Sequence, residues 1–139
     1  MTHQPNQLRN ITQRNNRRCR ALKVVNVHDV PYVPSSGGTT GGALNIKTLV
    51  DEHLGARDFK VAIATFPKGV RSNIHVHEFD QVHLVLSGRG IIADEEREVI
   101  FTEGMLAFIP AGERHWHGAT KDDEFSHLSI MGAKSLRKT

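Results

Sequence analysis

Short apolar runs rich in Val, Ile, Phe and Thr recur along most of this chain, and Gly, Pro or acidic residues interrupt them every several positions. Runs of this kind, bounded by turn-forming residues, are typical of antiparallel β-strands. No window shows a convincing 3.6-residue apolar period, which would indicate an amphipathic helix. The pattern therefore predicts an all-β protein. The expected strands span residues 44–50, 59–66, 72–78, 82–87, 89–93, 98–101, 105–109, 114–119 and 125–131.

Many short strands at this spacing form a sandwich or a closed barrel, because closure or a double-sheet jelly roll removes exposed strand edges. A chain of 139 residues has room for a single domain of this type. Residues 1–20 are rich in Asn, Gln and Arg and hold almost nothing apolar, so we expect a disordered basic leader there. The barrel domain is predicted over residues 21–139. The Gly- and Ser-rich stretch 35–42 is too short and too early to divide it.

The positive charge of the chain is concentrated in the leader and the few residues after it. The formal net charge is +3, but six basic residues precede the first acidic residue, Asp29. The rest of the chain has 12 basic against 15 acidic residues and is slightly acidic. A basic leader can contact the phosphates of a nucleic acid. This one, however, lacks aromatic side chains for base stacking, and it contains no folded nucleic-acid-binding motif. We therefore expect no nucleic-acid partner.

The apolar runs fall far short of the ~20 residues that a membrane helix requires. Cys19 is the single cysteine, so the chain cannot form an internal disulfide. The residues around it carry no apolar segment of the kind that a secretory signal needs. These observations predict a cytoplasmic protein with no membrane contact.

The histidines are the candidate functional residues. The chain has nine, and six of them lie between residues 75 and 127. Residues two apart on a strand point to the same face, so His75 and His77 should project together, as should His115 and His117. Gln81 follows a turn-like stretch and can return its side-chain oxygen to the same point. Three imidazoles and an amide oxygen suit one divalent ion such as Zn, Fe, Mn, Ni or Cu.

The spacing of these residues resembles the two motifs of the cupin family. The first motif is matched by Gly69, His75, His77, Gln81 and Gly88, with Gln81 at a position where cupins usually carry glutamate. The second is matched by Gly104, Pro110, Gly112 and His115, with Ala119 in place of the usual asparagine. Together they cover residues 69–119. The resemblance implies a double-stranded β-helix, the cupin jelly-roll barrel, with metal ligands His75, His77, Gln81 and His115 pointing inward.

A narrower resemblance involves the sequence HWHGA at residues 115–119, followed by His127. It is similar to small single-domain cupins associated with carboxymuconolactone-decarboxylase-like proteins, which also tend to carry glutamine as the fourth ligand. His117 and His127 are our candidate catalytic residues, as acid–base groups near the metal or groups that orient its ligands; otherwise they only line the pocket. His83 shares the parity of Gln81, but we interpret it as a core histidine. Gly88 and Gly104 are expected at turns between strands.

A neutral ligand set leaves the ion electrophilic, and its open positions are typical of catalytic sites. The leading hypothesis is a metal-dependent enzyme with isomerase, lyase or hydrolytic chemistry on a small carbonyl or carboxylate compound. One alternative is a metal-dependent dioxygenase. Another is a non-catalytic cupin that binds or senses a small ligand. Because small cupins are commonly dimers, the resemblance also implies a homodimer.

Overall fold

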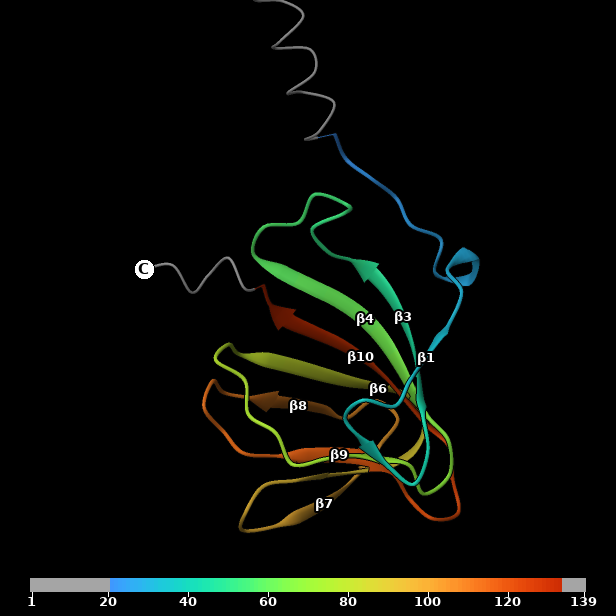
Figure 1. Ribbon diagram of the computed structural model, residues 1–139, viewed down its shortest axis with the longest axis vertical. Coiled ribbons are helices and arrows are strands. Elements are labelled where there is room, and N and C mark those ends of the chain that lie inside the picture. Colours follow the sequence, from blue (N-terminus) through green and yellow to red (C-terminus); the bar gives the residue numbers. More distant parts are fainter. Residues whose placement is uncertain (1–20, 134–139) are drawn as a thin grey trace, which may run out of the picture.

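The computed structural model describes residues 21–133, which form a single antiparallel β-barrel (Figure 1). The predicted leader at residues 1–20 lies outside the described residues. A 3-10 turn, η1 (Val27–Asp29), precedes ten strands, and no α-helix occurs in the described part. The strands are β1 (Val33–Ser35), β2 (Thr39–Thr40), β3 (Leu44–Val50), β4 (Phe59–Phe66), β5 (Arg71–Ser72), β6 (Gln81–Ala93), β7 (Glu98–Thr102), β8 (Leu106–Ile109), β9 (Trp116–Ala119) and β10 (Phe125–Gly132).

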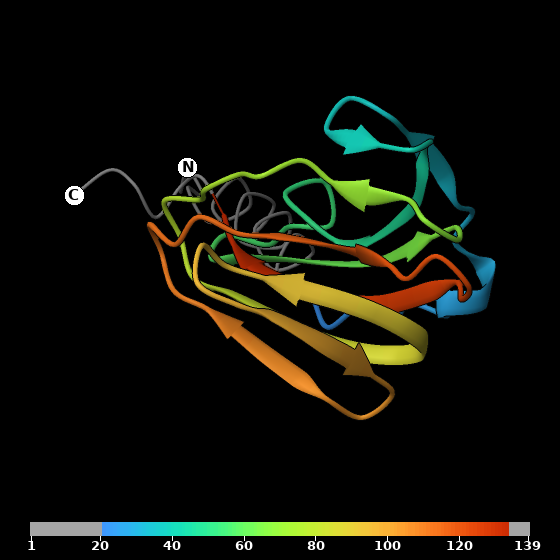
Figure 2. The same cartoon turned by 90° about the horizontal axis from the view of Figure 1, so that it is seen from below.

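The strands belong to two sheets that share β6. One sheet, which we call sheet A, joins β1, β3, β4, β10, the first half of β6 and β8. The other, sheet B, joins β2, β5, β9, the second half of β6 and β7. The two sheets face each other as the layers of a jelly roll (Figure 2). The predicted fold class is therefore confirmed.

The strands predicted at residues 82–87 and 89–93 are in fact one continuous strand, β6. Gly88 does not form a turn between strands; it has a φ of +79° inside β6, and the pairing with β10 shifts register two residues earlier, between Val85 and Ser87. A Cβ atom at this position would lie 1.8 Å from the carbonyl oxygen of Glu124. The left-handed glycine bends the strand, so that each half joins a different sheet. Gly104 does lie in a turn, between β7 and β8.

The prediction of a strand over residues 72–78 is also wrong. Only Arg71–Ser72 is paired regularly, in sheet B, and the next strand, β6, begins in sheet A. The segment between them crosses from one sheet to the other, so it cannot follow one ladder. It contains one isolated antiparallel bridge, between His75 and His115.

Alternate positions of the strands point into the barrel. At one end these inward positions are apolar and form the core, in which Phe66, Phe101 and Phe125 are fully buried. Burying a side chain of this size contributes roughly 2–3 kcal/mol. Further along the same strands the inward positions are occupied by His83, His127 and other polar residues. The change from apolar to polar lining marks the candidate site.

Candidate metal centre and cavity

Three of the predicted ligands converge where the bridge joins the two motif segments. The potential ligand atoms of His75, His77 and His115 all lie within 4.8 Å of one another. The ring centroid of His75 lies 4.2 Å from that of His115 and 4.9 Å from that of His77. The backbone supports this convergence, because the Gly112 N–H donates to the carbonyl of His77 at 2.8 Å. We call these three residues the outer triad.

Two imidazoles of the outer triad are oriented by the same local contact. Nδ1 of His75 lies 2.7 Å from the carbonyl oxygen of Asn73, and Nδ1 of His115 lies 2.9 Å from that of Glu113. A carbonyl can only accept, so each ring carries its proton on Nδ1 and keeps a lone pair on Nε2. Metal-binding histidines are commonly fixed in this way. The Nε2 atom of His115 is buried and has no hydrogen-bond partner within the described residues.

Gln81, the first residue of β6, presents its amide oxygen in a similar way. Its Nε2 donates to Oγ of Ser129 at 3.0 Å, which fixes the orientation of the amide. The buried Oε1 is left without a hydrogen-bond partner in the described part of the chain. His75, His77 and Gln81 also line one cavity. A buried acceptor without a donor costs about 1–3 kcal/mol, a cost that a cation removes.

These donors fit a transition-metal ion. Nitrogen ligands bound at ~2.0–2.1 Å around a tetrahedral ion lie roughly 3.4 Å apart, so the outer triad needs only small side-chain shifts to bind one. His75, His77, His115 and Gln81 would hold such an ion. Metal binding by these four residues stays a prediction, and so does the identity of the metal.

A second cluster of histidines lies deeper in the barrel. His83 of β6, His117 of β9 and His127 of β10 bring their potential ligand atoms within 4.8 Å of one another. They are 0%, 8% and 2% exposed. Their ring centroids lie 4.2 Å apart for His83 and His127, and 4.6 Å apart for His83 and His117. We call these three residues the inner triad.

His83 is more than the core histidine that its place in the sequence indicates. This residue is fully buried, as expected of a core histidine, but it also lines the cavity together with the two candidate catalytic residues. The sequence does indicate that His83 faces the cavity, because it follows Gln81 by two positions on one strand. Residues in that relationship point to the same side of a sheet.

Burial keeps the inner triad neutral. Desolvation lowers the pKa of His83 and of His117 well below the usual value, and the neighbouring imidazoles lower it further. Burial lowers the pKa of His127 to about 4. Burial also lowers the pKa of His115, in the outer triad. Near neutral pH, the inner imidazoles are therefore uncharged and can accept a proton or bind a cation.

The cavity that joins the two triads has a volume of about 320 Å³. Gln81, Ser129 and histidines from both triads form its polar side. Ile46, Ala62 and Phe66, from β3 and β4, lie on its apolar side. No carboxylate of the described residues lines it. The size and lining suit a small, mostly uncharged organic molecule.

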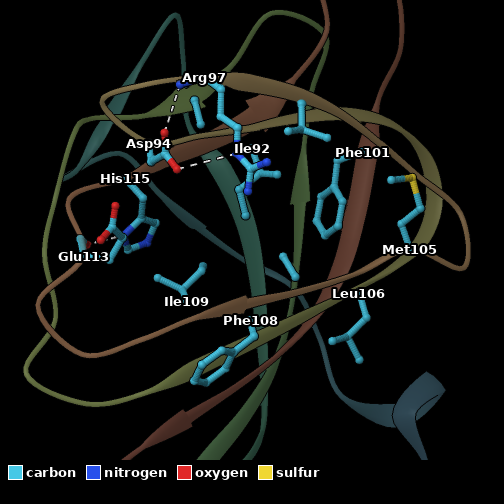
Figure 3. Close-up of a pocket in the computed structure, with 13 residues that line it drawn as sticks. Ile92, Asp94, Arg97, Phe101, Met105, Leu106, Phe108, Ile109, Glu113 and His115 are labelled. Carbon is cyan, nitrogen blue, oxygen red and sulfur yellow. Dashed lines mark hydrogen bonds and ion pairs between the residues drawn. The ribbon is translucent and has the colours of Figure 1, made fainter.

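A second cavity of about 300 Å³ lies beside the ring of His115 (Figure 3). Figure 3 shows His115 with Glu113 at one end of this cavity and Phe101 with Met105 at the other. The side chains of Asp94 and Arg97 form an ion pair of 3.8 Å along its border. Because the ring of His115 also contacts that of His75, His115 lies between the two cavities.

With this geometry established, comparison with known proteins places the chain in a family. Residues 62–131 match the model of the cupin domain. The chain belongs to the cupin family. The narrower likeness to carboxymuconolactone-decarboxylase-associated cupins stays a prediction.

The part of the chain that the structure describes holds no helix with the length and hydrophobicity of a membrane span.

One curated relative is the (R)-mandelonitrile lyase of Granulicella tundricola, which is 34% identical over 71 residues. The match covers 50% of this chain and 54% of the relative, so this cupin spans about half the length of that enzyme. A cupin-like protein of Thermotoga maritima has 29% identity and a TM-score of 0.68, over 76% of this chain and 80% of that one. The polyketide cyclase RemF of Streptomyces resistomycificus has 22% identity and a TM-score of 0.72, over 81% and 80%, and is similar in fold.

Proposed function

We propose that this cupin is a metal-dependent lyase that cleaves a small hydroxy compound, such as a cyanohydrin, to a carbonyl compound. The observation that carries the proposal is that two neutral histidines, His117 and His127, line the same cavity as His75, His77 and Gln81, three of the four donors of the outer metal centre. The relative that acts on (R)-mandelonitrile supports a lyase.

A divalent ion bound by His75, His77, Gln81 and His115 would supply Lewis-acid polarisation of the substrate oxygen. The apolar wall formed by Ile46, Ala62 and Phe66 accepts the hydrocarbon part of the substrate and excludes water from it. With the substrate bound in this way, its hydroxyl would lie between the outer triad and the inner triad.

The catalytic roles belong to His127 and His117, whose rings lie 5.3 Å apart. One of these imidazoles takes the hydroxyl proton on a ring nitrogen, and the electron pair of that O–H bond forms the carbonyl. The bond between the carbonyl carbon and the leaving carbon then breaks. The leaving group, cyanide in the case of a cyanohydrin, departs with the electron pair and takes up the proton. General acid–base catalysis of this type contributes typically 10²–10⁴-fold to a rate.

The test combines metal analysis with an assay on mandelonitrile. We expect the natively purified protein to contain a transition metal and to release benzaldehyde and cyanide. His75→Ala/His115→Ala should lose the metal of the outer centre and turnover, whereas His53→Ala, which removes an exposed histidine, should lose neither. Turnover in a double variant without metal at the outer centre would contradict the proposal, and so would inactivity of the wild type loaded with one equivalent of metal. Fe-dependent oxygen consumption would support a dioxygenase instead.

We also propose a homodimer that forms through the outer face of sheet A. Register places Leu106 opposite Leu84 and Phe108 opposite Val82, and Val82 is opposite Ile130 on its other side. Leu106 and Phe108 are each 61% exposed. Exposed apolar rows of this kind commonly mark a protein interface. A second copy of the chain can cover this self-complementary face.

A further inference from the structure

The inner triad has the features of a ligand set in its own right. Its three imidazoles come from three neighbouring strands, β6, β9 and β10, so the barrel fixes their positions. Both ring nitrogens of His83, both of His127, and Nδ1 of His117 are buried without a hydrogen-bond partner in the described part of the chain. Buried polar atoms are normally satisfied, and a group this rich in unpartnered nitrogens calls for an explanation.

We propose that His83, His117 and His127 form a second metal-binding site, which takes a borderline transition-metal ion such as Zn²⁺ or Co²⁺. The three ligand nitrogens lie within 4.8 Å of one another, the same limit that the outer triad meets. Neutral imidazoles suit these metals, whereas Mg²⁺ and Ca²⁺ require oxygen ligands. The site therefore selects nitrogen-binding ions.

The second ion binds more weakly than the first. The ring of His117 lies 5.5 Å from that of His75 and 5.9 Å from that of His115, so the two sites are neighbours. No carboxylate from the described residues lines the cavity to offset the charge of two dications. Because the ions repel each other across a poorly solvated cavity, we expect about a tenfold or larger difference between the two affinities.

Occupation of the inner triad has a functional consequence, which rests on the proposed function. A metal ion on His117 and His127 uses the lone pairs that would otherwise accept the substrate proton. The loaded inner site is therefore an inhibitory site. Excess metal should stop turnover without displacing the ion of the outer centre.

Co²⁺ titration tests the site without any activity measurement. We expect the wild type to bind two equivalents in equilibrium dialysis, with two successive visible absorption changes. His83→Leu should bind one equivalent, and His75→Ala/His115→Ala should also bind one, now with the spectrum of the inner site alone. The triple variant should bind none. His53→Leu, which removes an exposed histidine, is the matched control and should bind two.

Two results would overturn the proposal. One is a wild-type stoichiometry of one that His83→Leu leaves unchanged. The other is a folded His75→Ala/His115→Ala variant, with the circular dichroism of the wild type, that binds no Co²⁺. The latter variant keeps the inner triad intact, so it tests the site even if His83→Leu does not fold. Since stoichiometry is independent of turnover, failure of the proposed lyase activity leaves this test unaffected.

Discussion

His75 and His115 lie directly opposite each other and exchange both of their backbone hydrogen bonds. The N–H of His75 donates to the carbonyl of His115 at 2.9 Å, and the N–H of His115 donates to that of His75 at 3.0 Å. This one-residue bridge joins segments that lie 40 positions apart in the sequence. It therefore fixes the backbone distance between two predicted ligands, and an ion bound there would require only small side-chain adjustments.

Gln81→Glu should tighten metal binding. The substitution adds a negative charge to an otherwise neutral ligand set, and a charge a few ångströms from a divalent ion gains several kcal/mol even at an effective dielectric near 20. Desolvation of the buried carboxylate offsets part of this gain. We expect at least about a tenfold lower dissociation constant in competition with a chelator. Gln81→Leu removes the oxygen and should weaken binding by about tenfold or more. Equal affinities in all three proteins would show that residue 81 is not a ligand.

The metal-free protein should lose stability as the pH falls from about 6.5 to about 4. Burial lowers the pKa of His127 to about 4, whereas a histidine in the unfolded chain titrates near ~6.5. Between these values the unfolded chain takes up a proton that the folded chain does not, so acid favours unfolding. The loss from His127 alone is on the order of 3 kcal/mol, and the lowered pKa values of His83 and His117 act in the same direction.

Urea unfolding of the metal-free protein at several pH values measures this effect. His127→Leu should show a smaller loss of stability between pH ~6.5 and ~4, because it removes one of the groups that the unfolded chain protonates. His53→Leu, at an exposed position, serves as the control and should keep the wild-type dependence. A stability that does not change over this pH range would mean that the inner triad is already charged or solvated in the folded protein.

The sequence predicted the convergence of the candidate ligands better than it predicted the backbone that carries them. The motif spacing predicts that His75, His77 and His115 lie close together, and in the structure their potential ligand atoms do lie within 4.8 Å of one another. It did not reveal that residues 73–80 cross between two sheets, because strand periodicity describes a single ladder. The role of His83 was missed for a related reason. Its neighbours in the inner triad come from β9 and β10, and one strand's pattern contains no information about which other strands pair with it.

Gly88→Ala should be among the most destabilising small substitutions in the barrel. The residue has a φ of +79°, and an added Cβ atom would meet the carbonyl oxygen of Glu124 at 1.8 Å. We expect a loss of about 3 kcal/mol or more in the free energy of unfolding, from backbone strain and displacement of β10 together. Gly104→Ala is the matched control, because its φ is +82° but nothing lies within 4 Å of the added atom. It should cost only about 1–2 kcal/mol. Similar losses in both variants would contradict the role of close packing at Gly88.

Leu106→Glu/Phe108→Glu should convert the proposed dimer to a monomer. Both side chains lie on β8 in the apolar rows of sheet A, and each is 61% exposed in the single chain. In a two-fold dimer, the glutamates introduced in one subunit would lie close to the same glutamates of the other subunit. Like charges buried in this way without partners are strongly unfavourable. Light scattering coupled to gel filtration should report twice the chain mass for the wild type and the chain mass for the variant. Ile100→Glu, at a 44% exposed position on β7 of sheet B, is the control and should remain dimeric. A wild type that elutes as a monomer at micromolar concentration would rule out this interface.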